Sequence, residues 1–167
     1  MKRNFIAISV LVVLVFAALP ALAQAPAANP LLGTWTVNIA KSKYSPADLT
    51  PKSGTTTFAA ASGGIRVTND GVDNQGRKTH QEYTTNFDGK DVPCNCTIDG
   101  KPSPNQDSVS WRKIDDYTYE LVAKLKGQAL TTTRIVVARD GKTRTGTATG
   151  KNAQGQTINN SVLQEKK

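Results

Sequence analysis

Residues 117–150 read "YTYELVAKLKGQALTTTRIVVARDGKTRTGTATG", and this stretch decides the fold class. Two glycine-containing turns, Lys126-Gly127 and Asp140-Gly141-Lys142, divide it into three segments of ordinary strand length. Within 117–125 the odd positions are Tyr, Leu or Ala and most even positions are polar, so an extended chain would be apolar on one face. The segments are rich in Thr and Val, which favour strands. The stretch is therefore predicted to form three antiparallel strands joined by tight turns.

The same turn signals recur through the rest of the chain, for example at Asp99-Gly100 and Gln154-Gly155. No segment after the N-terminal region has a convincing helical period, and the best helical candidate is a single turn near 45–49. The turns predict nine or ten strands, at about 33–40, 54–61, 64–73, 77–87, 90–93, 107–114, 117–125, 128–139, 142–150 and 156–165.

Consecutive strands joined by tight turns form an up-and-down antiparallel meander. An open meander of this size would leave two long edge strands, which promote aggregation, and closing the sheet removes both. We therefore predict an all-β fold in which the meander of nine to ten strands closes into a barrel or a flattened clam. A two-sheet sandwich is the alternative; it needs longer crossover connections, and only segments 41–53 and 94–106 are long enough to provide them.

The N-terminus has the features of an export signal. Two basic residues and an apolar run are followed by a proline and by Ala21-Leu22-Ala23, a site typical of signal peptidase. We predict a signal peptide at 1–23, a flexible leader at 24–30 and a single β-barrel domain at 31–167, exported to the periplasm or the extracellular space. The alternative is an uncleaved membrane anchor; after cleavage no stable membrane insertion is expected.

The charge of the chain does not identify a partner. Removing Lys2 and Arg3 from the 21 basic residues leaves 19, against 13 acidic ones. The basic residues are scattered and form no stripe of the kind that nucleic-acid binding needs, so none is predicted. The motifs of serine hydrolases, zinc proteases and P-loop enzymes are also missing, and the sequence predicts no enzyme activity, no cofactor and no catalytic residues.

The first predicted strand contains Gly33-Thr34-Trp35, which resembles the Gly-x-Trp signature of lipocalins and their fatty-acid-binding relatives. The longer opening "GTWTVNIAKSKYSP" (33–46) is similar to that of small secreted bacterial proteins of unknown role, described as lipocalin-like (calycin-type). The resemblance implies a lipocalin-like barrel in which Trp35 plugs one end and Gly33 lets the chain enter tightly. It also implies an arginine stacked on the tryptophan. The last strand has none, and Arg134, Arg139 and Arg144 in earlier strands could substitute.

Barrels of this size can enclose a small ligand if their inward side chains do not fill them. Gly146 and Ala148 share one face of a strand and are too small to fill the interior of the barrel beside them. Either a semi-polar cavity is open there, or bulky residues from neighbouring strands pack against them.

We predict an exported protein that binds a small apolar or amphipathic molecule. The alternative is a filled barrel, a structural or protein-interaction module without a small ligand; a protein partner is not identifiable. The candidate ligand-binding residues are Val37, Phe58, Val67, Tyr83, Val109, Trp111, Tyr119 and Leu121.

Cys94 and Cys96 are the only cysteines, and an exported protein in an oxidising compartment favours their oxidation. We predict a local Cys94–Cys96 disulfide. An intermolecular disulfide, free thiols, and a metal or redox role remain as alternatives. A metal is disfavoured because soft metals need more ligands than this pair supplies, and no metal site is predicted.

Overall fold

The structure is a computed structural model that describes residues 29–167. The predicted signal peptide and most of the predicted leader lie outside the described residues. Two short 3-10 helices, η1 (Ile39–Lys41) and η2 (Ala47–Leu49), lie between the first two strands; η2 coincides with the turn expected near 45–49. The strands are β1 (Gly33–Val37), β2 (Ser53–Ala61), β3 (Gly64–Val72), β4 (Lys78–Thr85), β5 (Asp88–Pro93), β6 (Asn95–Ile98), β7 (Lys101–Pro102), β8 (Ser108–Lys113), β9 (Thr118–Leu125), β10 (Gln128–Val137), β11 (Thr143–Lys151) and β12 (Thr157–Lys166).

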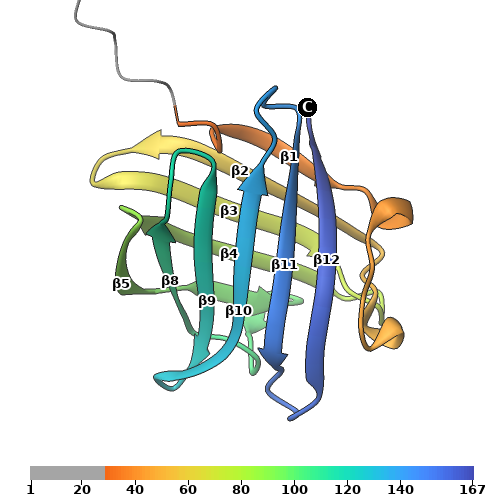
Figure 1. Cartoon of the computed structure of the whole chain (residues 1–167). Coiled ribbons are helices and arrows are strands. Elements are labelled where there is room, and N and C mark those ends of the chain that lie inside the picture. Colours follow the sequence, from red (N-terminus) through yellow and green to blue (C-terminus); the bar gives the residue numbers. More distant parts are fainter. Residues whose placement is uncertain (1–28) are drawn as a thin grey trace, which may run out of the picture.

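All twelve strands belong to one antiparallel sheet, in the order β5-β8-β9-β10-β11-β12-β1-β2-β3-β4-β6-β7. The sheet curls into a half-barrel in which β8–β12 form one wall and β1–β4 cross behind them (Figure 1). Strands β12 and β1 join the two walls, with Trp35 opposite Lys166 and Val37 opposite Gln164. The predicted all-β antiparallel fold is confirmed.

The sheet has two strands more than the sequence indicated, because β6 and β7 form a hairpin in the segment 94–106. The hairpin turns at Asp99 and Gly100, whose φ angles of 51° and 76° are both positive, as a type I′ turn requires. Gly100 tolerates that angle without steric cost. Asp99-Gly100 therefore forms a hairpin turn within the segment 94–106, which was predicted to be a long connection.

No ladder joins the two ends of the sheet, β5 and β7, within the described chain. Instead the chain itself crosses from one end to the other, since Cys94 connects β5, paired with β8, to β6, paired with β4. Both edges are protected against further pairing. Strand β7 has two residues, one of them proline, and β5 is charged and irregular in register.

The core lies between the walls and consists of inward side chains from both. The rings of Phe58 on β2 and Trp111 on β8 meet edge to face with centroids 5.8 Å apart, and Phe87 meets Trp111 in the same way at 5.6 Å. Such pairs contribute about 0.5–1.5 kcal/mol beyond the area they bury. Aromatic contacts across the interior thus hold the walls together where no backbone ladder does.

Candidate functional site

The predicted ligand-binding residues all lie on strands that enclose the interior, but they have different surroundings. Six of the eight are buried and two, Val37 and Leu121, are partly exposed. Phe58, Tyr83, Trp111 and Leu121 line a half-open cavity of about 200 Å³ on the inner face of the sheet, here called the interior cavity. The others do not line it: Val37 borders a separate hollow beside Gly54, and the remaining three are packed in the core, namely Val67, Val109 and Tyr119.

Trp35 lies at the end of the half-barrel where the described chain enters and leaves. Its side chain is completely buried, and its indole Nε1 donates a hydrogen bond of 2.7 Å to the carbonyl of Leu31. Gly33 has a φ of +111°, and a Cβ there would lie 2.9 Å from Cε of Lys166. Glycine is favoured at position 33 by this positive φ, which residues with a side chain rarely adopt; the lysine carbon is the end of a flexible side chain and can move aside.

Asn29, although part of the segment expected to be a flexible leader, is bound to this end of the sheet. Its side-chain oxygen accepts hydrogen bonds from the backbone of Leu31 at 3.0 Å and from the hydroxyl of Tyr119 at 3.1 Å. Trp35, Leu31 and Asn29 together cover this end of the interior.

Arg144 on β11 is the arginine that stacks on the tryptophan. Its guanidinium carbon lies 5.2 Å from the ring centroid of Trp35 and 4.7 Å from that of Phe58. Of the three arginines named as substitutes, Arg139 instead lies over Tyr117, at 5.0 Å. The last strand also places a cation over this ring, since Nζ of Lys166 lies 5.1 Å from the centroid of Trp35.

The guanidinium of Arg144 is buried without a counter-charge. The residue is 5 % exposed, and neither Nε nor Nη1 has a hydrogen-bond partner among the described residues. No ion pair of residues 29–167 includes it. Burial lowers the pKa of Arg144 to about 9, which still leaves the group charged at neutral pH. A buried guanidinium with free donors is costly by itself and binds a carboxylate or phosphate well.

The interior cavity lies beside this guanidinium, and its lining has two chemically different parts. The aromatic part is fixed by a hydrogen bond from Nε1 of Trp111 to the hydroxyl of Tyr83, at 3.0 Å. Burial raises the pKa of Tyr83 to about 12, so its hydroxyl is neutral and cannot neutralise Arg144. The other part consists of smaller or polar residues from both walls: Thr56, Asn69, Thr133, Gly146, Ala148 and Gln164.

This arrangement decides between the two alternatives for Gly146 and Ala148. Both line the cavity, so the space that they leave is not filled by bulky residues from the opposite wall. The cavity volume corresponds to about seven water molecules at liquid density, which is below the usual range for drug-sized ligands. The cavity can hold a small molecule or a part of a larger one.

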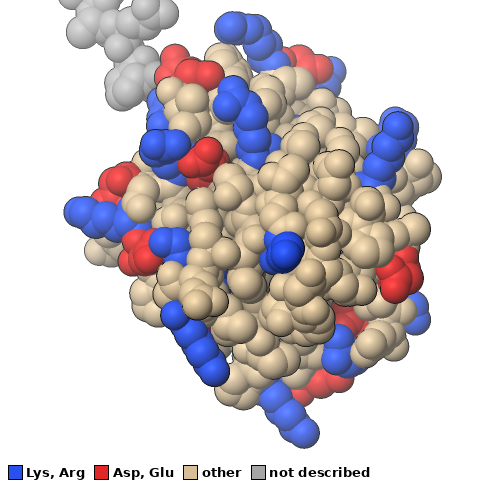
Figure 2. Space-filling view, turned by 60° about the horizontal axis from the view of Figure 1, so that its bottom comes forward, with Lys and Arg blue, Asp and Glu red and all other residues tan. Residues whose placement is uncertain are grey.

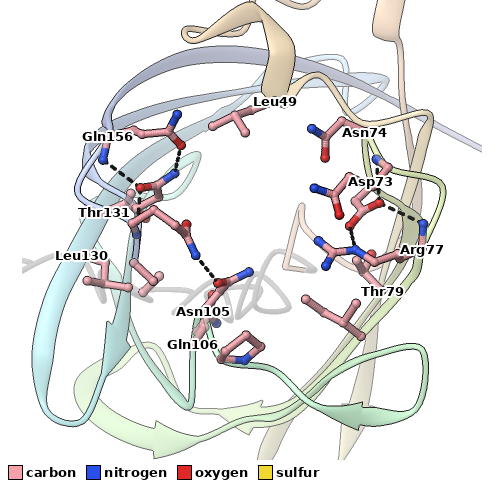
Figure 3. A pocket seen from close by; sticks show the side chains of 17 residues that line it. Leu49, Asp73, Asn74, Arg77, Thr79, Asn105, Gln106, Leu130, Thr131 and Gln156 are labelled. Carbon is pink, nitrogen blue, oxygen red and sulfur yellow. Dashed lines mark hydrogen bonds and ion pairs between the residues drawn. The ribbon is translucent and has the colours of Figure 1, made fainter.

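A second, larger hollow of about 520 Å³ opens at the opposite end of the half-barrel (Figure 3). We call it the mouth. Turns 73–77 and 152–156, the segment 104–106 and Leu49 of η2 surround it. Thr131 lines the mouth and Thr133, two positions along β10, lines the interior cavity, so both hollows lie on the inner face of the sheet.

Most of the polar lining of the mouth is amide. On the side of the molecule that Figure 2 brings forward, basic and acidic side chains are interspersed and form no large patch of one sign. The amide side chains of the mouth are Asn74, Gln75, Asn105, Gln106, Asn152, Gln154 and Gln156. The charged groups Asp73 and Arg77 are paired with each other, with Arg77 Nε donating to Asp73 at 2.7 Å. Burial tends to raise the pKa of Asp73, but hydrogen bonds from the backbone and side chain of Arg77 and from the backbone of Gln75 outweigh it and lower the pKa.

The structure pairs Cys94 and Cys96 in a disulfide, as predicted. The pair lies where the chain crosses between the ends of the sheet. Cys96 is buried, while Cys94 is partly buried against the core. The disulfide is separate from both hollows described above.

The amides of the mouth were not predicted from the sequence, and Arg144 was predicted only as a partner of the tryptophan. A signal for the inward position of Arg144 was available, since on β11 it shares a face with Gly146 and Ala148, opposite the threonines. The amides gave no such signal, because Asn and Gln in turns are ordinary surface residues.

In comparisons with known proteins, no family model matches the chain and no curated protein matches it in sequence. Among residues 29–167 no helix is long and apolar enough to cross a membrane.

Proposed function

We propose that this chain is an exported binding protein that holds a small amphipathic molecule in the interior cavity, with an anionic group of the ligand against Arg144. One observation carries the proposal: a charged guanidinium, 5 % exposed, with two nitrogens unpartnered among the described residues, borders a half-open cavity on the inner face of the sheet. A carboxylate accepts charge-assisted hydrogen bonds from a guanidinium. Nε and Nη1 are fully buried, so a ligand in the cavity bonds first to Nη2. The apolar part of the ligand then packs on Phe58, Trp111 and Leu121.

Several features support export and the lipocalin-like resemblance that accompany this proposal. The N-terminal sequence pattern is typical of a signal peptide, and a disulfide is more usual outside the cytoplasm. The resemblance rests on the Gly-x-Trp opening and the longer stretch 33–46, and the contact of Arg144 with Trp35 is compatible with it. Mass measurement of the protein from its own host tests export, and the expected N-terminus is Gln24.

Ligand binding can be tested with pairs of probes that share an apolar part and carry either a carboxylate or a neutral hydroxyl. Hexanoate and benzoate are expected to change the fluorescence of Trp111 and Trp35 saturably, whereas hexanol and benzyl alcohol bind at least ten-fold more weakly. Arg144→Met should abolish the preference for the acids. Ala148→Leu should fill the cavity and block both kinds of probe, while its circular dichroism spectrum stays that of the wild type.

Equal binding of the acid and the alcohol would contradict the role of Arg144, but it would still be consistent with ligand binding in the cavity. If no probe binds saturably, the proposal as a whole fails, and the filled module without a small ligand becomes the better description. Native mass spectrometry of protein purified from its host provides a second readout, because a co-purified acid would appear as an added mass that Ala148→Leu removes.

A further inference from the structure

The mouth differs from the interior cavity in chemistry as well as in position. Leu49, Ile98, Pro104, Ala123 and Leu130 give it an aliphatic part without any aromatic ring. Its volume of about 520 Å³ lies within the range of small-molecule sites. Figure 3 shows labelled side chains from opposite sides of the mouth pointing toward a common open space.

The walls of the mouth are held in place by hydrogen bonds between its own loops. Gln154 Nε2 donates to Asn105 Oδ1 at 2.9 Å, which connects the β11–β12 turn to the segment before β8. Asn152 accepts from the backbone of Gln154 and of Gln156 and donates to the side chain of Gln156 at 2.6 Å. On the other side Asn74 donates to the carbonyl of Asp48 at 2.7 Å. These bonds hold Asn74, Asn105, Asn152, Gln154 and Gln156 in place before any ligand arrives, which lowers the entropic cost of binding at those amides.

Several amide groups still have hydrogen-bonding capacity to offer. Within residues 29–167 the side chains of Gln75 and Gln106 form no hydrogen bond, and the bridge between Gln154 and Asn105 uses one group of each amide. An amide carries two donor hydrogens on nitrogen and an acceptor oxygen. The mouth thus presents donors and acceptors together around a hollow that is partly aliphatic.

This pattern selects among ligand classes. An anion would need an unpaired cation, but among residues 29–167 the one cation in the lining, Arg77, has its charge balanced by Asp73. A cation would need an unpaired carboxylate, but the carboxylate of Asp73 is paired with Arg77. A purely apolar molecule would remove water from amides and give no hydrogen bond in return. A hydroxyl group both donates and accepts, as an amide side chain does, and the C–H face of a sugar ring can pack on aliphatic residues.

From these contacts we propose that the mouth binds a neutral polyhydroxylated molecule, of the size of a mono- or disaccharide, independently of the anion-binding cavity. Gln75 and Gln106 form hydrogen bonds to its hydroxyl groups, and Leu130 and Ile98 contact its ring carbons. The proposal does not depend on Arg144 and goes beyond the proposed function, since it concerns a second site with a different ligand class.

The test is a titration of the purified mature chain, followed by backbone amide NMR shifts, with trehalose, maltose and N,N′-diacetylchitobiose as probes. At least one sugar is expected to give saturable shifts confined to 73–77, 104–106 and 152–156. Gln75→Ala and Gln106→Ala should each weaken binding five-fold or more. Neither side chain has an internal hydrogen bond to lose, so these variants should fold normally. Asn86→Ala, an exposed amide outside the mouth lining, is the matched control and should change nothing.

Arg144→Met and Ala148→Leu separate this proposal from the previous one. Both variants should bind the sugar within two-fold of the wild type, whatever their effect on hexanoate. The proposal is overturned if no probe gives saturable shifts at 50 mM, or if gluconate binds more tightly than the neutral sugars. Shifts that map to the interior cavity, or affinity unchanged in both glutamine variants, would also overturn it.

Discussion

Arg144 combines two opposing contributions to stability. Its contacts with Trp35 and Phe58 are favourable, and a desolvated cation–π contact contributes about 2 kcal/mol. Against this, a charge buried without a counter-charge costs several kcal/mol, and the unpartnered nitrogens add to that cost. We expect the unfavourable contribution to be the larger one in the ligand-free protein.

Arg144→Met should therefore raise the free energy of unfolding by about 2 kcal/mol, since replacing a buried charge by a packed apolar side chain is commonly stabilising. For a chain of this length, thermal unfolding should show this as a rise of roughly 4–8 °C in Tm. Arg139→Met is the control, because Arg139 also lies over an aromatic ring but is exposed; it should change Tm little. A lower Tm for Arg144→Met would mean that the aromatic contacts outweigh the buried charge.

At the scale of the element, β10 and β11 show how a local irregularity shapes the mouth. The register of β10 against β9 shifts between Ala129 and Thr131, so Leu130 lies in a bulge. Gly150 on β11 has a φ of +135°, and a Cβ there would collide with the carbonyl of Leu130. Glycine at 150 thus allows the bulge that turns Leu130 toward the mouth.

Gly150→Ala should destabilise the protein by about 2–3 kcal/mol, because the substitution adds a collision with backbone to an unfavourable φ angle. Gly155→Ala separates the two effects. Gly155 also has a positive φ, of 80°, but nothing lies within 4 Å of an added Cβ, so about 1 kcal/mol is expected. Urea unfolding measures both values, and equal losses would show that φ alone, not the approach of Leu130, requires glycine at 150.

The turn between β3 and β4 depends on the charge of Asp73. Its carboxylate accepts hydrogen bonds from the backbones of Gln75 and Arg77, at 2.9 Å each, and from the side chain of Arg77. Because its pKa in the folded protein is below the ordinary value of 3.8, the unfolded state binds the proton more readily. This contribution is present above pH 3.8 and is lost as the pH falls through the folded pKa.

Asp73→Asn should accordingly cost about 1 kcal/mol at pH 7, and the difference from wild type should shrink as the pH falls below 3.8. Urea unfolding at a series of pH values measures it. Asp140→Asn provides a matched turn aspartate, since Asp140 accepts a backbone hydrogen bond from Lys142 but has no ion pair within the described chain. A pH-independent difference for Asp73→Asn would show that its charge does not matter.

For the whole molecule, the notable feature is that the sheet curls without a ladder between its ends. The two ends are connected by the chain passing through Cys94 and by side-chain contacts across the interior. The disulfide encloses only a minimal loop, so its effect on unfolded-chain entropy is small, on the order of 1–2 kcal/mol. We infer that the core, rather than the disulfide, keeps the half-barrel curled.

The double variant Cys94→Ser/Cys96→Ser should lose no more than about 2 kcal/mol and should keep the far-ultraviolet spectrum of a β-protein. Trp111→Leu is the comparison, because it removes the ring contacts with Phe58 and Phe87 and the hydrogen bond to Tyr83. It should cost about 3 kcal/mol or more. If the cysteine variant unfolds more readily than Trp111→Leu, the disulfide has the larger role.

Ten of the twelve strands were predictable from the sequence, and the reasons are local. Alternating side chains and turn residues mark each strand separately. Lys126 and Gly127, for example, predicted the turn between β9 and β10, and both have positive φ angles in the structure. The β6–β7 hairpin was missed because its strands are short and contain Asn, Lys and Pro rather than β-formers. The inward direction of Phe58, Tyr83 and Trp111 followed from the alternation of side chains along a strand, which does not depend on the rest of the fold.

The sequence by itself determined ten of the strands and their antiparallel connection, and it favoured the pairing of Cys94 with Cys96, because each depends on residues close together in the chain. Only the tertiary structure decided that Arg144 lies against Trp35 and Phe58 without a counter-charge, and that amides from separate turns surround one mouth. The physical reason is that the curl of the sheet brings together groups that are more than a hundred residues apart, such as Trp35 and Arg144. Hydrophobic burial favours the curl, but it is not directional. The geometry of the curled sheet therefore depends on how all the inward side chains pack together.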